Sequence, residues 1–207
     1  MAKPDYLIGL DLGQTGEFTA LVVVEQLGQE EESVFNVRQL KRYQPGTGYR
    51  KILDDVAGLI EKGPLEDLNP TLIVDGTSAG AAVVQMFRSR LAGSCSDLQP
   101  VLISAGDTDT RDADWWRIPK RDLVSAVQAT LQSGRLKIAK ELPEAPTLIR
   151  ELEQFKTKIV AASSTDALVA WREGANDDLV LALALAVWVG LSHRYIRVLS
   201  MDDWSWR

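Results

Sequence analysis

Residues 6–11, Tyr6-Leu-Ile-Gly-Leu-Asp11, form an apolar run that ends in a carboxylate. The same pattern returns at Thr71-Leu-Ile-Val-Asp75, a second short β-rich run closed by an aspartate. The pair Asp177-Asp178 reverses the order, because it opens the long apolar run of residues 179–191. An unpaired charge buried at such a position costs several kcal/mol or shifts its pKa. Something must therefore compensate these carboxylates, and a divalent metal ion would do so.

The residue types present narrow the kind of metal site. The chain has one His, His193, and one Cys, Cys95, so it cannot assemble a zinc site from His and Cys ligands. Mg²⁺ and Mn²⁺ prefer carboxylate and water oxygens, and three clustered carboxylates repel one another strongly until cations enter. Carboxylates that hold two metal ions about 3.5–4 Å apart catalyse in-line displacement at phosphorus. Asp11, Asp75 and Asp178 indicate this chemistry; the alternative is that each is only a turn or helix-cap residue.

Length and composition indicate one domain. With 207 residues, 45% of them hydrophobic, the chain can bury a core of its own, so we expect residues 1–207 to form a single domain in which 191–207 is a C-terminal tail. The apolar run 179–191 is shorter than the roughly 20 residues that cross a bilayer, and the residues after 1–5 do not have the pattern of a secretory signal. We therefore expect no membrane partner and a cytoplasmic location, that of the host cell if a virus encodes the chain.

The net charge of -6 does not exclude nucleic acid as a partner, because an acidic metal cluster contributes several of the negative charges. Basic side chains gather in three stretches, each of which either lines a phosphate-binding face or is an ordinary solvated surface. These stretches contain Arg111, Arg117, Lys120 and Arg121; Arg135, Lys137 and Lys140; and Lys156 and Lys158.

Apolar periodicity and turn residues predict an α/β order. A three-strand antiparallel meander comes first, and strands connected by helical crossovers follow. The predicted strands are residues 6–11, 18–27, 34–43, 71–75, 99–104 and 135–138. The predicted helices are residues 52–60, 81–91, 123–131 and 146–155, with a buried helix from residue 178. We expect a polar loop at residues 106–114 and an exposed hairpin at residues 156–171.

This order is that of the ribonuclease H-like fold, a mixed sheet flanked by helices. More narrowly, the sequence resembles the C-terminal nuclease domain of tailed-bacteriophage terminase large subunits over roughly residues 5–190. The stretches that carry the resemblance are Ile8-Gly-Leu-Asp11 with Glu17-Phe-Thr-Ala-Leu21, Leu72-Ile-Val-Asp-Gly-Thr-Ser-Ala-Gly80, Ile118-Pro-Lys-Arg-Asp-Leu123 with Gly134-Arg-Leu-Lys-Ile138, and Asn176-Asp-Asp-Leu-Val-Leu-Ala-Leu-Ala-Leu-Ala186.

The resemblance implies a metal-dependent endonuclease that cuts double-stranded DNA with little sequence preference during viral genome packaging. Two Mg²⁺ or Mn²⁺ ions would be its cofactors. By position, Asp11, Asp75 and Asp178 would be the catalytic metal ligands. Asp177 would be the alternative ligand of its pair, and Glu17 would be an auxiliary ligand.

The resemblance also concerns DNA and partner proteins. The predicted DNA-binding residues are the two at the start of the helix after Pro119, with three further basic side chains: Lys120, Arg121, Arg117, Lys156 and Lys158. The small-residue turn of residues 76–80 would let a helix N-terminus approach the second ligand. No Gly-x-x-x-x-Gly-Lys-Ser/Thr loop occurs in the chain, so a packaging ATPase would be a partner, together with the portal and the small terminase subunit.

Three other functions compete with this hypothesis. A junction-resolving or repair nuclease of the same fold would use identical carboxylate chemistry. The stretch Ile8-Gly-Leu-Asp-Leu-Gly-Gln-Thr-Gly16 also resembles the phosphate loop of sugar kinases and actin-like ATPases, although those proteins need two such domains. A catalytically silent interaction module could dock a partner through Trp204 and Trp206.

Overall fold

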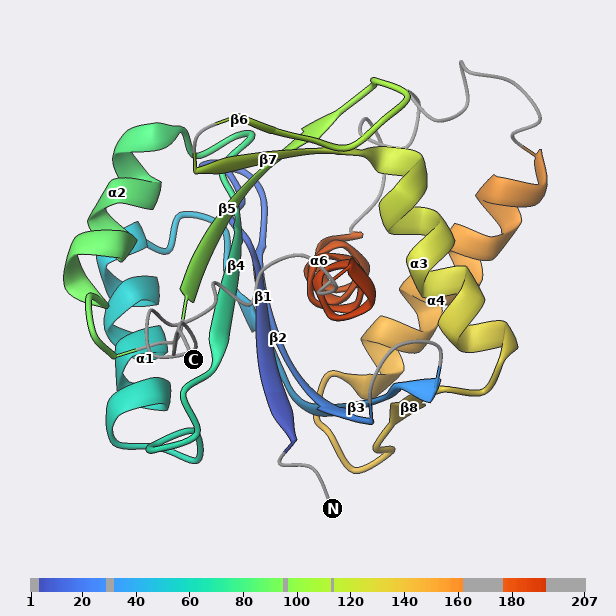
Figure 1. Cartoon of the computed structure of the whole chain (residues 1–207), viewed down its shortest axis with the longest axis horizontal. Helices are drawn as coiled ribbons and strands as arrows, with labels where there is room; N and C mark the ends of the chain where they lie inside the picture. Colours follow the sequence, from blue (N-terminus) through green and yellow to red (C-terminus); the bar gives the residue numbers. More distant parts are fainter. Residues whose placement is uncertain (1–3, 29–31, 95–96, 113, 162–176, 193–207) are drawn as a thin grey trace, which may run out of the picture.

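The computed structural model describes residues 4–28, 32–94, 97–112, 114–161 and 177–192, and it centres on one eight-stranded sheet (Figure 1). The strands are β1 (Asp5–Asp11), β2 (Thr19–Leu27), β3 (Val34–Tyr43), β4 (Thr71–Asp75), β5 (Asp97–Ser104), β6 (Thr110–Asp112), β7 (Trp115–Pro119) and β8 (Leu136–Ile138). The helices are α1 (Tyr49–Glu61), α2 (Ala81–Arg90), α3 (Lys120–Gln132), α4 (Ala145–Ala161) and α6 (Asp178–Ser192).

The strand order across the sheet is β6-β7-β5-β4-β1-β2-β3-β8. The first three strands form an antiparallel meander, whereas β1, β4, β5 and β7 run parallel to one another. β8 pairs in parallel with β3, and β6 pairs antiparallel with β7. The carboxyl ends of β1, β4, β5 and β7 consequently lie at the same end of the sheet. This mixed sheet confirms the predicted fold class.

Most predicted elements are present, and two predictions were wrong. The expected polar loop at 106–114 contains β6, and Trp115 and Trp116 belong to β7, because pairing with β5 supplies hydrogen bonds that the local sequence does not reveal. Residues 156–161 continue α4 instead of opening a hairpin. The rest of that predicted hairpin, residues 162–171, and the tail residues 193–207 with Trp204 and Trp206 lie outside the described residues.

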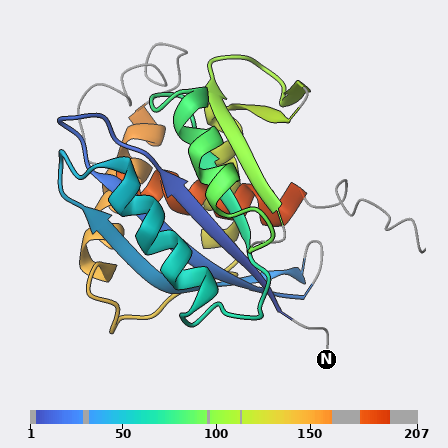
Figure 2. The ribbon, with the colours of Figure 1, turned by 90° about the vertical axis from the view of Figure 1, so that its left-hand side faces the viewer.

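Helices cover both faces of the sheet. Helices α1 and α2 lie on one face, and α6 lies on the other with α3 and α4 beyond it (Figures 1 and 2). Each face has its own apolar core, because successive side chains of a strand point to opposite sides. On β1, for example, Leu7 packs in the core with α6 and Ile8 packs in the core with α1 and α2.

Helix α6 is buried between the sheet and helices α3 and α4. Residues 179–190 are all buried except Leu181, which is why this helix is apolar on nearly every side. A glycine in β1 permits its close approach, since a Cβ on Gly9 would lie 1.8 Å from the backbone oxygen of Ala182. Among the described residues, no helix has the length and apolar character that crossing a membrane requires.

Candidate metal-dependent nuclease site

The strand alternation places two aspartates on the face that α6 covers. On β1, Leu7 and Gly9 face α6, so Asp11 at the end of the same strand points to that face. On β4, Ile73 belongs to the same core, so Asp75 also points toward the α6 side. Asp11 and Asp75 are register partners on adjacent parallel strands, whose backbones lie about 4.8 Å apart. Two predicted ligands are therefore neighbours at one end of the sheet.

Asp75 is fixed by the turn that follows it. Its side chain is buried, and its Oδ1 accepts a hydrogen bond of 2.8 Å from the backbone N–H of Thr77. The hydroxyl of Thr77 in turn accepts a 2.8 Å hydrogen bond from the N–H of Ile103 in β5. Gly80 has a φ of 81°, a conformation that favours glycine, and α2 begins at the next residue. The small-residue turn thus connects the second aspartate to a rigid part of the sheet.

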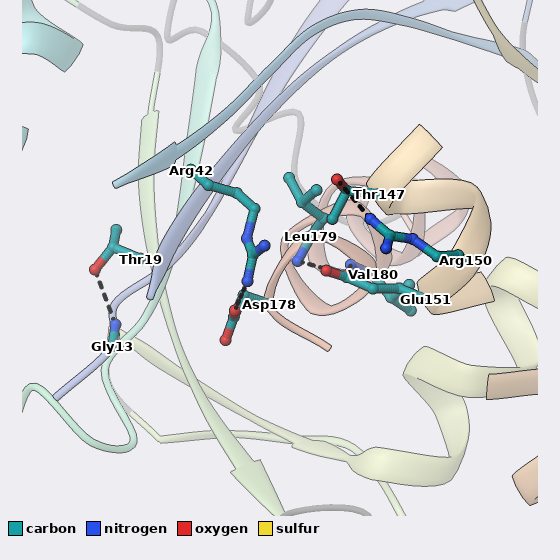
Figure 3. A network of polar contacts seen from close by, with 9 residues as sticks. All are labelled: Gly13, Thr19, Arg42, Thr147, Arg150, Glu151, Asp178, Leu179 and Val180. Atoms are coloured by element: carbon teal, nitrogen blue, oxygen red, sulfur yellow. Dashed lines mark hydrogen bonds and ion pairs between the residues drawn. The ribbon is translucent and has the colours of Figure 1, made fainter. Parts of the chain in front are cut away.

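Asp178 is the first residue of α6, and it brings a third carboxylate to this region. Its Oδ2 accepts a 3.0 Å hydrogen bond from Nη2 of Arg42 in β3 (Figure 3). The guanidinium of Arg42 lies over the ring of Phe18, 3.9 Å from the ring centroid. Arg42 was not predicted, because its role depends on β3 pairing with β2 beside the carboxylates.

Asp177 has a different position from Asp178. It is buried directly before α6, and its backbone oxygen accepts the hydrogen bond of Leu181 N–H that starts the helix. The charge of Asp178 is close enough to raise the pKa of Asp11, whereas Asp177 influences the pKa of Asp178 and Glu151. These relations favour Asp178 as the member of the pair that shares a site with Asp11.

Glu17 lies in the exposed turn between β1 and β2. Its Oε2 accepts a 3.0 Å hydrogen bond from the backbone N–H of Gln14. Its negative charge contributes to the raised pKa of both Asp11 and Asp178. The turn therefore brings Glu17 near Asp11 and Asp178, as an auxiliary ligand would require.

The electrostatics of this region are dominated by burial and mutual repulsion. Burial raises the pKa of Asp11 well above its ordinary value, and the charges of Asp75, Asp178 and Glu17 raise it further. Burial also raises the pKa of Asp178, although the hydrogen bond from Arg42 acts in the opposite direction. Burial and the closeness of other carboxylates thus disfavour the charged forms of Asp11 and Asp178.

The donors at this site fit a hard divalent cation in type and charge, since all are carboxylate oxygens around a small region. In the part of the chain that the structure describes, however, no three acidic, His or Cys side chains already lie close enough together to enclose a metal ion. Asp178 is bound to Arg42, and Asp75 is bound to the turn backbone.

The sequence matches the family model for the terminase RNase H-like domain over residues 8–188. The chain belongs to this family. The match spans nearly the whole sheet, α1 to α4 and most of α6, and it confirms the resemblance to terminase nuclease domains. Membership in the family supports a role as a nuclease hydrolase.

Solved structures show the same fold at low sequence identity. The terminase nuclease domain of human cytomegalovirus, manganese-soaked and inhibitor-bound, has a TM-score of 0.57 and 15% identity, covering 90% of this chain and 84% of that one. The large terminase nuclease of thermophilic phage G20c with bound magnesium has a TM-score of 0.51 and 16% identity, covering 90% and 82%. The large terminase of a second thermophilic bacteriophage has a TM-score of 0.53 and 14% identity, covering 92% of this chain and 40% of that one. No curated protein sequence matches the chain.

The predicted DNA-binding residues of this terminase RNase H-like domain are only partly near the aspartates. Arg117 is exposed in β7, and Lys120 and Arg121 begin α3, at the end of the sheet where β1 and β4 also finish. Nη1 of Arg121 is bound to Asp107 at 2.8 Å, so part of its charge is neutralised. Lys156 and Lys158 belong to α4 and not to a hairpin, because α4 extends to Ala161.

Glu151 is a further acidic residue that the sequence did not reveal. It lies on α4, and its Oε2 accepts hydrogen bonds of 3.1 Å from the backbone N–H groups of Leu179 and Val180 at the start of α6 (Figure 3). Its Oε1 is buried without a hydrogen-bond partner among the described residues, and burial raises its pKa to about 7. The sequence did contain a sign of its burial, because Glu151 lies among the apolar positions of α4, beside Leu148 and Leu152.

Proposed function

We propose that this terminase RNase H-like domain is a divalent-metal-dependent endonuclease that hydrolyses double-stranded DNA with little sequence preference during viral genome packaging. The observation that supports the proposal is the pairing of Asp11 and Asp75 at one end of the sheet, beside Asp178 at the start of α6. There burial and neighbouring carboxylates raise the pKa of Asp11, and burial raises that of Asp178. Such a surplus of buried negative charge is what two Mg²⁺ or Mn²⁺ ions would neutralise.

The roles of the side chains follow from their positions. Asp11 and Asp75 would bind metal from adjacent strands, whose hydrogen bonds keep the two carboxylates at a fixed separation. Asp178 would bind from the start of α6, with Glu17 as an auxiliary ligand and Asp177 supporting the helix start. The bound ions would activate a water molecule and stabilise the leaving oxygen at phosphorus.

The basic residues would hold the DNA backbone and not read bases. Arg117, Lys120 and Arg121 belong to β7 and the start of α3, at the end of the sheet where β1 and β4 finish, and Lys156 and Lys158 belong to α4. Contacts to phosphate fix the position of a duplex without conveying sequence. A nuclease built in this way cuts with little sequence preference.

The partners in this proposal are double-stranded DNA and the other parts of a packaging machine. The large terminase of the second thermophilic bacteriophage, of which this chain covers 40%, is the longer protein in that comparison. The chain itself contains no Gly-x-x-x-x-Gly-Lys-Ser/Thr loop. A packaging ATPase would therefore act beside this domain, with the portal and the small terminase subunit as further partners.

Plasmid cleavage tests the proposed activity. Supercoiled plasmid incubated with the protein and Mn²⁺ or Mg²⁺ should become nicked, then linear, then degraded, and excess EDTA should stop every stage. Sequencing of the early ends should show many cut positions without a consensus. Cleavage that persists in excess EDTA would contradict the metal mechanism, and intact plasmid in both metals would contradict the nuclease assignment.

A further inference from the structure

Arg42 places a positive charge beside Asp178, one of the three proposed ligands. Its Nη2 lies 3.0 Å from Oδ2 of Asp178, and the two side chains are only 13% and 17% exposed. The ion pair of Arg90 and Glu61 on the other face of the sheet is more open, with side chains 43% and 25% exposed. The Arg42–Asp178 pair is thus shielded from water, where attraction between opposite charges is stronger.

The sheet itself directs Arg42 to this place. Cross-strand register forms one row from Asp75 in β4 through Asp11 in β1 and Ala20 in β2 to Arg42 in β3. Adjacent strands are about 4.8 Å apart, so Arg42 lies two strands from Asp11 with only a small alanine between them. The ring of Phe18 supports the guanidinium at 3.9 Å from its centroid, an arrangement that holds its position and adds cation–π attraction.

The hydrogen bonds of Arg42 are incomplete. Its Nε is buried and has no hydrogen-bond partner among the described residues. A guanidinium buried for structural reasons usually uses its donors fully, because a buried donor without a partner lowers stability. Among the described residues, Arg42 gives one hydrogen bond, to Asp178, so the guanidinium is not held by a full set of partners.

We propose that Arg42 is a positioning residue that competes with divalent metal for Asp178: it holds the carboxylate in the metal-free protein and releases it when metal binds. This inference rests on the proposed metal site, and it adds a residue of the protein, Arg42, that competes with the metal ion for Asp178. It explains why Asp11, Asp75 and Asp178, all among the described residues, share one end of the sheet without enclosing a metal position. A divalent ion that binds several carboxylates outweighs the single charge of Arg42.

Binding of Mn²⁺ without DNA tests this competition. The signal of free Mn²⁺ in electron paramagnetic resonance gives the affinity of the wild type and of Arg42→Gln. Removing the competing charge should tighten Mn²⁺ binding by about tenfold or more, because the cluster then attracts the ion without having to release Asp178 first. The metal-free variant should melt at a lower temperature than the wild type, since the carboxylates lose their internal counterion.

Two further variants separate competition from a general structural effect. Arg42→Lys keeps the positive charge but loses the planar guanidinium group, so its Mn²⁺ affinity should lie between those of the wild type and Arg42→Gln. Arg38→Gln is the matched control, because Arg38 lies on the same strand and binds Glu25 through its Nε at 3.0 Å, away from the three aspartates. Its Mn²⁺ affinity should equal that of the wild type.

The outcomes distinguish this inference from the proposed function. Tighter binding in Arg42→Gln, unchanged binding in Arg38→Gln and loss of binding in Asp178→Asn would support the competition. Mn²⁺ affinity in Arg42→Gln equal to or weaker than that of the wild type would overturn it while leaving the metal site in place. If neither the wild type nor any Arg42 variant binds Mn²⁺, the proposed metal site fails, and the competition fails with it.

Discussion

The acidic side chains of α1 and those around the start of α6 have opposite electrostatic environments. Hydrogen bonds from Arg90 and then from Ser94 lower the pKa of Glu61 to about 2. Burial raises the pKa of Asp55, but hydrogen bonds from Lys41 and Lys51 outweigh burial and lower it overall. Near α6, burial and neighbouring acids raise the pKa of Asp11, Asp178 and Glu151 instead.

These opposite pKa shifts depend on whether a basic side chain of the protein lies beside each acid. Two acids of α1 have basic partners, since Glu61 pairs with Arg90 and Asp55 with two lysines. The acids near α6 come from β1, β4, α4 and α6, and Asp178 of this group forms an ion pair with Arg42. In the proposed function, a cation from solution would supply the counter-charge that these acids lack. The following experiments test this contrast, beginning with the largest effect.

Neutralising one aspartate near α6 should abolish cleavage. In Asp11→Asn or Asp75→Asn we expect plasmid cleavage to fall by at least about a thousandfold, because a lost ligand removes several kcal/mol of transition-state stabilisation. The metal-free Asp11→Asn protein should be as stable as the wild type or more stable, since one repelling charge is gone. Asp55→Asn in α1 is the control and should cut at the wild-type rate.

Asp178→Asn should differ from Asp11→Asn in the stability of its metal-free form. Asp178→Asn should also lose cleavage, but its metal-free form should be less stable than Asp11→Asn, because Arg42 would lose its ionised partner. Wild-type cleavage by Asp178→Asn together with loss of cleavage in Asp177→Asn would show that Asp177 is the ligand.

The stability of the metal-free protein should decrease as the pH rises. Burial raises the pKa of Glu151 from 4.5 to about 7, so between these values the folded protein keeps a proton that the unfolded chain has released. The free energy of unfolding should therefore fall by roughly 3 kcal/mol across this range, as urea titrations at several pH values would measure. The Glu151→Gln variant has no carboxyl group at this position to titrate, so its free energy of unfolding should decrease less over the same pH range. Identical pH profiles for the two proteins would contradict this account of Glu151.

Metal should stabilise the wild type and not the ligand variants. At a Mn²⁺ concentration about a hundredfold above the dissociation constant, binding adds about 2.7 kcal/mol to the free energy of unfolding, which raises the melting temperature by roughly 5–10 °C. Asp55→Asn should show the full increase, and Asp11→Asn should show little. An equal increase in Asp11→Asn would mean that Mn²⁺ binds elsewhere.

The basic start of α3 should affect DNA binding but not metal binding. Replacing Lys120 and Arg121 by Ala should weaken duplex binding by about tenfold at low salt, and the loss should shrink as salt rises. Asp107→Asn is a matched variant with the opposite expectation, because it frees Arg121 from its ion pair. If the double variant binds DNA like the wild type throughout a salt titration, the duplex must follow another basic surface.

Local sequence signals predicted most of the helices and strands. The strands β3 and β4 begin and end at the predicted residues, since each is a β-rich run bounded by turn residues. The strand β6 was not predicted, because its three exposed residues Thr110–Asp112 are stabilised only by pairing with β7. The end of α4 was also missed, since its Thr and Val residues favour strands when judged locally.

The candidate site, too, could be predicted only where it depends on the local strand pattern. Asp11 and Asp75 close parallel strands, whose carboxyl ends must meet at one end of a sheet, so their proximity followed from the strand pattern. Arg42 and Glu151 could not be found in this way. Arg42 reaches Asp178 because β3 joins the sheet beside β2, and Glu151 reaches the start of α6 because α4 packs on that helix. Both contacts join residues that are distant in the sequence, 136 positions apart for Arg42 and 28 for Glu151.

The smallest effect should come from the ion pair of Glu61 and Arg90 on the exposed side of α1. Although Nη2 of Arg90 lies 2.9 Å from Oε2 of Glu61, an exposed pair is screened by water and costs side-chain entropy. Glu61→Gln should therefore change the melting temperature by less than about 2 °C at neutral pH and leave cleavage and Mn²⁺ affinity unaltered. A large loss of stability would show that the acids of α1 are not simply compensated surface charges, and the contrast with α6 would then lie in burial alone.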